Sequence, residues 1–291
     1  MSPVEWLPAS SPIFSLLNLK NRQSLAPNLP KQTSEKGGVL SRYRNVAMNH
    51  LSPQLDEKII SDASSINGWL QPREMRFLAL AVLNQTAEGR IVELGSYHGK
   101  STSVLASTIQ HTGGEKLISV DPIDPRPLHD NLARLGLQDY VDARHQTSTD
   151  FAANWKSPIG FLWHDGANDY ATVQQDCRDL FPLLTDRSIV AFHDVLNASG
   201  ERIHIFDEMV LNSPNFGWVG ICGSIGFGQY RATSMATLEQ AQVKRKLSKK
   251  LARLKPFHHA TQPNPKGWQH MKYKAWRSRI AHGPVTEFRA A

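Results

Sequence analysis

The stretch IVELGSYHGKST, residues 91–102, decides the fold of this chain. Four residues of strand character, IVEL, run directly into a glycine turn, GSYHG, and KST then opens a helix. Glycine lets the backbone turn sharply and approach a ligand closely. The helix start behind the turn offers free amide groups and a positive dipole end to a carboxylate or phosphate. The segment therefore predicts a strand–loop–helix unit suited to a ligand with an anionic group.

Two common nucleotide motifs come close to this loop but do not match it. The dinucleotide pattern GxGxxG is absent, because three residues separate Gly95 and Gly99. The pattern GxxxxGK[ST] is one residue too long for GSYHGKS, and Leu94 stands where its first glycine belongs. A triphosphate-binding loop is therefore disfavoured, and a glycine turn without any ligand is the plain structural alternative.

Outward from this unit, short apolar runs alternate with helical segments. The predicted strands are Arg90–Leu94, Lys116–Asp121, Val141–His145, Ile159–Trp163, Ser188–Phe192, Gly217–Cys222 and Gly226–Arg231. The predicted helices are Lys100–Gln110, Pro127–Leu135, Thr149–Trp155, Tyr170–Leu184 and Ser199–Leu211. Five strand–helix alternations predict a parallel sheet with helices on both faces. The short link between the last two strands permits an antiparallel hairpin but not a crossover.

The chain divides into three predicted segments. Residues 1–52 mix Pro, Ser, Asn and Lys without periodicity and are expected to form a poorly ordered arm. Residues 53–235 are expected to form the α/β domain, with two N-terminal helices in residues 53–85. Residues 236–291 are expected to form a basic tail, partly helical and partly irregular.

The charge of the chain is concentrated in that tail. From Val243 onward there are 13 Lys and Arg residues and one acid, Glu287, whereas the rest has 20 basic and 25 acidic residues. An apolar stripe at helical spacing consists of Val243, Leu247, Leu251 and Leu254. The basic residues around it are Lys244, Lys246, Lys249, Lys250 and Arg253. Such a helix either docks on an anionic membrane or a nucleic acid, or packs on the domain with a solvated basic face.

The start MSPVEWLPAS lacks a basic segment before an apolar one, so a secretory signal is not expected. The only two cysteines, Cys177 and Cys222, lie in no metal-binding spacing. Both features predict a reducing, cytoplasmic location. The oligomeric state stays open, a homo-oligomer included.

The first loop resembles motif I of class I S-adenosylmethionine (SAM)-dependent methyltransferases, in the ELGxYxGxS form of catechol-type O-methyltransferases. A second stretch, FLWHDGANDYATVQQDCRDLFPLLTDRSIVAFHDV at residues 161–195, is similar to the pattern of bacterial methyltransferase family 24. The resemblance covers about residues 67–231. It implies a Rossmann-like α/β fold with a seven-stranded, mostly parallel sheet, a C-terminal antiparallel hairpin and helices on both faces.

The resemblance also implies SAM as the cofactor. The residues expected under its amino-acid end are Gly95, Ser96, Tyr97 and Gly99, with Ser101 at its carboxylate and Glu93 near its amino group. Asp121 is expected to accept hydrogen bonds from the ribose hydroxyls, as a carboxylate can from a vicinal diol. A turn-forming or capping role is the alternative for Asp121. The adenine is expected near Gln146, Thr147 or Ser148, and Ser148 is the candidate for the contact with it.

In metal-using relatives, acids after the fourth and fifth strands bind a divalent cation that lowers the pKa of the acceptor hydroxyl. Asp165 and Asp194 match those positions with His193 beside them, and such ligands suit Mg²⁺ or Mn²⁺. Otherwise Asp165 holds the SAM amino group while Asp194 orients His193 as general base. Asn168 stands where many relatives have a histidine, and Val195 where catechol-type enzymes have an Asn ligand. These departures leave metal dependence open.

The candidate catalytic residues are therefore His193, Asp165 and Asn168. The predicted function is SAM-dependent O-methylation of a small-molecule acceptor, a sugar or a secondary metabolite. The alternative is a degenerate SAM-binding protein that acts as an interaction module through its basic tail. The intact first loop favours the enzyme, whereas Asn168 and Val195 favour the alternative.

Overall fold

A computed structural model describes residues 51–232, 235–259 and 264–282. The predicted N-terminal arm lies outside these ranges, apart from its last two residues. All described residues belong to one compact unit, Asn45–Ala291. Within the described ranges, no helix has the length and apolar character needed to pass through a bilayer.

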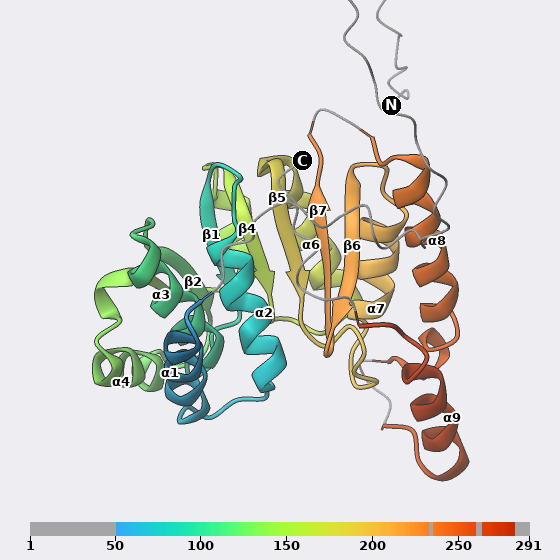
Figure 1. Cartoon of the computed structure of the whole chain (residues 1–291), viewed down its shortest axis with the longest axis horizontal. Coiled ribbons are helices and arrows are strands. Elements are labelled where there is room, and N and C mark those ends of the chain that lie inside the picture. Colours follow the sequence, from blue (N-terminus) through green and yellow to red (C-terminus); the bar gives the residue numbers. More distant parts are fainter. Residues whose placement is uncertain (1–50, 233–234, 260–263, 283–291) are drawn as a thin grey trace, which may run out of the picture. The chain divides into compact units, whose positions relative to one another are not determined.

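A single sheet of seven strands forms the centre of the domain (Figure 1). The strands are β1 Arg90–Leu94, β2 Leu117–Asp121, β3 Val141–His145, β4 Ile159–His164, β5 Leu184–Phe192, β6 Phe216–Cys222 and β7 Ile225–Tyr230. Their order is β3-β2-β1-β4-β5-β7-β6. The first five strands are parallel, whereas β7 is antiparallel to both β5 and β6. The predicted fold class, including its closing antiparallel hairpin, is confirmed.

Helices precede, connect and follow the strands. They are α1 Pro53–Ser64, α2 Pro72–Leu83, α3 Lys100–Thr112, α4 Arg126–Leu135, α5 Ser148–Asn154, α6 Tyr170–Leu180, α7 Arg202–Ile205, α8 Leu238–Leu251 and α9 Gly267–Arg277. Short 3-10 turns lie at Gln138–Tyr140, Phe181–Leu183 and Lys255–Phe257, and a π-helical stretch, Phe206–Leu211, continues α7.

The period-two alternation of strand side chains gives the domain two apolar cores. In β4, Phe161 and Trp163 pack on one face of the sheet with residues of α1, α2, α3 and α4. Leu162, between them, packs on the opposite face with residues of α5, α6, α7 and α8. The sheet therefore lies between two helical layers, and the carboxyl ends of its parallel strands remain at one edge.

Two predicted boundaries were wrong for local backbone reasons. The helix predicted for Tyr170–Leu184 ends at Leu180 and continues as a 3-10 turn that contains Pro182, which has no amide to donate. β5 begins at Leu184 rather than Ser188, and its register shifts before Ile189. Arg187 lies in this irregular part with a φ of 69°, so the sequence does not show the alternation of a regular strand there.

The segment after β7 is folded against the domain. Thr237 caps α8 in a reciprocal pair with Gln240. Leu251 and Leu254 of the predicted stripe are fully buried, and Leu247 packs against the same core. Val243 was assigned to the wrong face, because it is exposed while its neighbour Lys244 points inward. The ammonium of Lys244 donates to the carbonyls of Ser213 and Phe216, which explains how a lysine occupies this place.

Candidate active site

A cavity of about 670 Å³ lies at the carboxyl edge of the parallel strands, within the size range of small-molecule sites. The loops after β1, β2, β4 and β5 line it together with the loop between α1 and α2. Its lining includes the predicted residues Gly95, Ser96, Tyr97, Ser101, Asp121, Ser148, Asp165, Asn168, His193 and Asp194. The fold thus brings most of the predicted site residues to one place.

The loop after β1 has a backbone that requires glycine. Gly95 has a φ of +92°, and a Cβ there would lie 2.4 Å from the amide nitrogen of Gly166. Gly99 has a φ of +91°, and a Cβ there would lie 2.7 Å from a methyl carbon of Leu128. The hydroxyl oxygen of Ser96, between these glycines, is buried and has no hydrogen-bond partner among the described residues. An unpartnered buried hydroxyl in a cavity wall fits a ligand that supplies the missing partner.

Asp121, at the end of β2, orders this loop. One carboxylate oxygen accepts the amide hydrogen of Tyr97 at 2.7 Å, and the other accepts that of Ile123 at 2.9 Å. Tyr97 has a φ of 47°, which is unusual for a residue with a side chain. A carboxylate oxygen has more than one lone pair, so Asp121 can also accept from a ligand.

Glu93 differs from its predicted role. Its side chain is fully buried, does not line the cavity and accepts hydrogen bonds from three hydroxyls, at 2.5 Å from Ser101, 2.7 Å from Thr102 and 2.7 Å from Ser119. Burial raises the pKa of Glu93 to about 7 although these hydroxyls lower it. The hydroxyl hydrogen of Ser101 is used by Glu93, so it is not available for a cofactor carboxylate. Glu93 therefore holds the start of α3 in place through the hydroxyls of Ser101 and Thr102.

Of the residues expected near the adenine, Thr147 and Ser148 line the cavity at the start of α5, whereas Gln146 does not. The side chain of Thr147 accepts from the amide of Asp150 and so caps the helix. Ser148 is thereby the better placed of the candidates for a contact inside the cavity.

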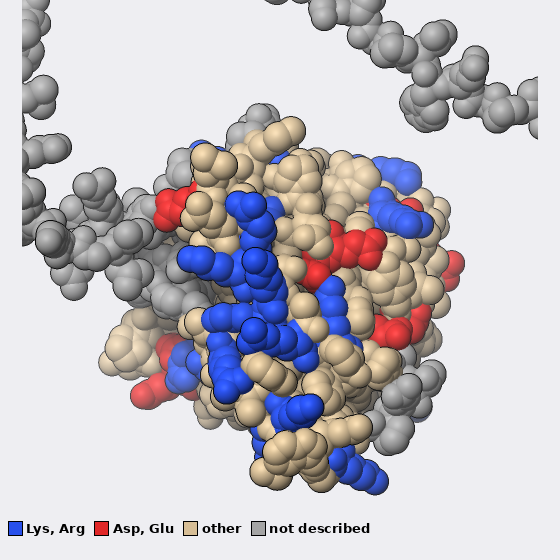
Figure 2. Space-filling model, turned by 90° about the vertical axis from the view of Figure 1, so that its right-hand side faces the viewer, with Lys and Arg blue, Asp and Glu red and all other residues tan. Residues whose placement is uncertain are grey.

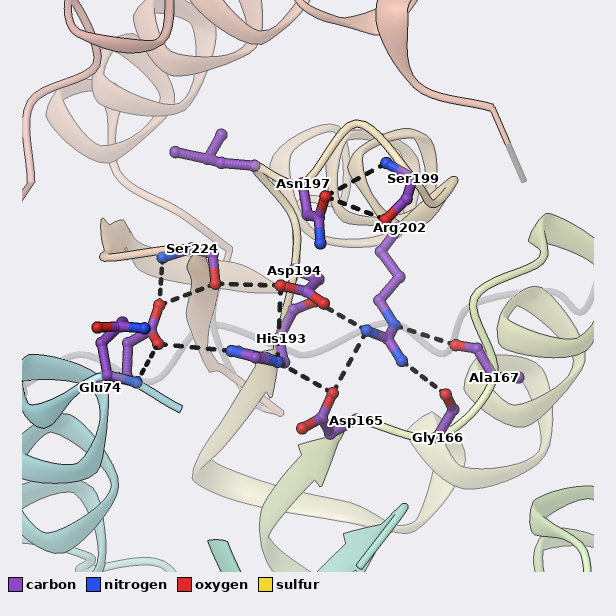
Figure 3. A network of polar contacts seen from close by, with 12 residues as sticks. Glu74, Asp165, Gly166, Ala167, His193, Asp194, Asn197, Ser199, Arg202 and Ser224 are labelled. Carbon is purple, nitrogen blue, oxygen red and sulfur yellow. Dashed lines mark hydrogen bonds and ion pairs between the residues drawn. The ribbon is translucent and has the colours of Figure 1, made fainter. Parts of the chain in front are cut away.

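A network of charged side chains includes residues that line the cavity, Asp165, His193, Asp194 and Arg202 (Figure 3). His193 is its centre: Nδ1 lies 3.1 Å from Asp165 and 3.7 Å from Asp194, and Nε2 lies 3.5 Å from Glu74. Glu74 belongs to α2 and also accepts hydrogen bonds from the amide and the hydroxyl of Ser224, at 2.6 and 2.8 Å. Asp194 has a φ of 56°, so its backbone is strained at the cavity.

The surroundings of His193 keep its imidazole protonated. Burial would lower its pKa, but the charge of Asp165, the hydrogen bond with Asp165 and the nearby carboxylate of Glu74 raise it to about 10. Burial would likewise raise the pKa of Glu74, but the nearby imidazole of His193 and hydrogen bonds from the Gln71 and Ser224 amides lower it to about 2. An imidazole with carboxylates on both sides is a cation with no lone pair to offer. This arrangement argues against the predicted role of His193 as general base.

Arg202 occupies the region in which the sequence predicted a metal ion. Its guanidinium is buried, lies 3.4 Å from Asp165 and donates to the carbonyls of Ala167 and Gly166 at 3.0 and 2.7 Å. The charges of both Asp165 and Asp194 act on it. In the part of the chain that the structure describes, no three His, Cys, Asp or Glu side chains are arranged to hold a metal.

The predicted ligand set of Asp165, Asp194 and His193 therefore does not fit a divalent cation. The sequence argument was that two neighbouring acids need a cation between them, and the cations present are Arg202 and protonated His193. Both are side chains of the chain itself.

Asn168 also lines the cavity, and its carbonyl oxygen accepts the amide hydrogen of Glu201 at 3.0 Å. Its amide side chain lies close to Gly200, where a Cβ would be 3.3 Å from Oδ1. Its position in the cavity wall allows Asn168 to contact a ligand. It does not allow the role of a base, because an amide takes no proton at neutral pH.

Sequence reasoning missed Glu74, Arg202 and Ser224. A signal for the first two was present. Glu74 is in register with Phe77, Leu78 and Ala81 on the apolar face of its helix, and Arg202 similarly precedes Ile205 and Phe206. A charged residue at an inward position of an apolar stripe needs a buried partner. Ser224 carried no such signal.

Comparisons with known proteins agree with this fold. A family model described as "Methyltransferase domain" matches residues 92–195. A structure from Klebsiella pneumoniae, assigned as an O-methyltransferase, is 14% identical, with 62% of this chain and 92% of that chain covered and a TM-score of 0.50. An O-methyltransferase from Bacillus cereus in complex with SAH is 16% identical, with the same coverage and a TM-score of 0.49. The O-methyltransferase TomG from Streptomyces achromogenes, in complex with SAM, is 15% identical over 62% and 92%, with a TM-score of 0.47.

The matched residues begin inside β1 and end at Val195, directly after Asp194, so they contain residues 161–195 and all of residues 91–102 except Ile91. Residues 92–195 of the chain match a methyltransferase domain, and the fold is that of the Klebsiella pneumoniae structure. This match confirms the methyltransferase interpretation of the first loop and of the pattern that ends at Val195.

Proposed function

We propose that this enzyme transfers the methyl group of SAM to a hydroxyl oxygen of a small-molecule acceptor, a sugar or a secondary metabolite. The supporting observation is that one cavity holds both the glycine loop after β1 and the charged network after β4 and β5. A donor held by the loop and an acceptor placed against the network would meet there. The relatives named as O-methyltransferases support oxygen as the acceptor atom.

The cavity wall suits SAM at three points. Gly95 and Ser96 leave room and an unpaired hydroxyl at the loop, Asp121 offers carboxylate oxygens for a diol, and Ser148 lies at the far end. Glu74, Asp165 and Asp194 set three carboxylates against the two cations His193 and Arg202. This excess of negative charge favours a ligand with a sulfonium and an ammonium group.

SAM, when bound, supplies an activated methyl group, and the chain has to position the acceptor and remove its proton. Asp165 and Asp194 are the residues of the network with partly exposed carboxylates, at 23% and 26% of their side-chain surface. We assign the hydroxyl proton to Asp194, with Arg202 and His193 holding the pair of acids in place. The acceptor oxygen then gains the methyl group as it gives up its proton.

Replacing Asp121 by alanine is expected to weaken SAM binding by about 1.5–3 kcal/mol, because charge-assisted hydrogen bonds are lost. Isothermal titration calorimetry with SAM and with SAH measures this change. Asp124→Ala is the matched control, since Asp124 is a nearby acid that pairs with Arg126 and does not line the cavity. No SAM binding by the intact enzyme would refute the proposed function.

Because Arg202 occupies the expected metal region, we predict that a chelator leaves turnover within about twofold of its original rate. The measurement is SAH formation over a panel of phenolic and sugar hydroxyl acceptors, with and without EDTA. Asp194→Asn should abolish turnover on the same acceptors while SAM binding persists. If EDTA stops turnover and Mg²⁺ restores it, the prediction is wrong and the reaction requires a divalent cation.

A further inference from the structure

The outward faces of α8 and α9 form a continuous basic surface, visible as a column of Lys and Arg in Figure 2. The exposed basic residues of α8 that contribute to it are Arg245, Lys246, Lys249 and Lys250, and Arg253 follows directly after the helix. The opposite face of α8 is fixed to the domain by Leu251 and Leu254, both fully buried. The basic residues are therefore presented by a rigid helix rather than by a loose tail.

The helix α9 adds apolar residues to this surface. Trp268 and Met271 are one turn apart, and they are 69% and 60% exposed. Lys272 and Lys274 lie beside them on the exposed side of the helix. The opposite side is anchored by Tyr273, whose buried hydroxyl donates to the carbonyl of Leu196. Two large apolar side chains flanked by lysines thus point into solvent from a fixed position.

Little acidic charge opposes this surface. Within the described residues 235–259 and 264–282, the acid is Glu239, in the first turn of α8. Arg253, after α8, and Arg279, after α9, both lie 4.6 Å from the ring of Trp276, so the two helices share one cationic edge. The surface is consequently complementary to a dense array of negative charge.

Exposed large apolar residues distinguish between the two polyanions that the sequence left open. Met235 and Leu238, before and at the start of α8, are 75% and 81% exposed and add to Trp268 and Met271, whereas the exposed Trp69 and Ile123 line the cavity. A nucleic acid would be bound by the basic residues alone or with aromatic stacking, which gives methionine and leucine no part. A membrane interface takes up Trp, Met and Leu together with a basic polar face.

We propose that the α8–α9 surface docks the enzyme on the surface of an anionic phospholipid membrane, with Trp268 and Met271 entering the headgroup region. The loop side of the sheet, where the cavity lies, contributes none of these residues. The proposal is therefore independent of the proposed acceptor chemistry, and either can fail without the other.

Flotation of the full chain with vesicles tests this docking. Vesicles of phosphatidylserine and phosphatidylcholine should bind the chain, and vesicles of phosphatidylcholine alone should bind it at least about tenfold more weakly. Binding should also fall steeply between about 0.05 and 0.5 M salt. The double variant Lys246→Glu/Lys249→Glu should lose about tenfold or more in affinity.

The matched control is Lys116→Glu/Lys156→Glu, which changes the charge equally at two exposed lysines of the sheet domain. It should bind the same vesicles as the unchanged chain does. Trp268→Ser should weaken vesicle binding about threefold without altering the salt dependence. Circular dichroism and SAM titration of each variant report on folding.

Three results would overturn the proposal: equal binding to both kinds of vesicle, equal loss in the control variant, or tighter binding to a duplex oligonucleotide that Trp268→Ser leaves unchanged. The last result would assign the surface to nucleic acid instead.

Discussion

Replacing Arg202 by methionine is expected to lower the free energy of unfolding by about 3–5 kcal/mol. Methionine retains much of the length of the side chain but none of its donors. Asp165 would keep a partly buried carboxylate without its guanidinium, and the carbonyls of Gly166 and Ala167 would lose their partner. Urea denaturation followed by circular dichroism measures the change.

The matched control is Arg279→Met, because Arg279 is exposed and contacts the ring of Trp276 from solvent. That substitution should cost less than about 1 kcal/mol. If both variants unfold at the same urea concentration, Arg202 is not the cation that the acids depend on.

Replacing Gly95 by alanine is expected to reduce SAM affinity at least about a hundredfold, roughly 2.8 kcal/mol. The added Cβ would lie 2.4–2.5 Å from backbone atoms of Gly166 and Asp165, in a residue whose φ of +92° disfavours any side chain. Neither neighbour is a flexible side chain that could turn away. The loop after β1 and the loop after β4 must therefore separate, and both line the cavity.

Gly113→Ala separates this steric effect from the cost of a positive φ. Gly113 ends α3 with a φ of +75°, and nothing lies within 4 Å of its Cβ position. This variant should lose about 1 kcal/mol of stability and bind SAM as the unchanged chain does. Calorimetry of both variants decides the matter: equal SAM affinity in Gly95→Ala would show that the loop does not hold the cofactor.

The strands and the cofactor loop could be predicted because their signals are local. Ile91–Leu94 and the glycines behind it carry strand, turn and helix start within a dozen residues. The parallel order then follows from alternation, and with it the shared edge that brings Asp121, Asp165 and Asp194 together. Boundaries at Leu180 and Leu184 could not be predicted, since a proline turn and a register shift decide them.

The charge state of the site could not be predicted from the same motifs. Whether two acids hold a metal depends on which cation reaches them, and Arg202 does so from a helix outside the family patterns quoted above. Likewise, burial opposes the raised pKa of His193 and the charge of Asp165 raises it, and Glu74, which adds to this effect, lies 119 positions earlier in the chain. Lys244 misled the helix analysis for a related reason, because carbonyls of another segment satisfy its ammonium.

The contact between Glu74 and Ser224 also bears on the order in which the enzyme is built. The two residues are 150 positions apart, and the turn between β6 and β7 carries Ser224. Loop closure over such a separation is entropically costly and comes late in folding. During synthesis, α2 leaves the ribosome well before the hairpin that will hold its carboxylate. A nascent chain that stops short of β7 leaves Glu74 without this partner, so we expect cofactor binding to begin only after the hairpin has emerged.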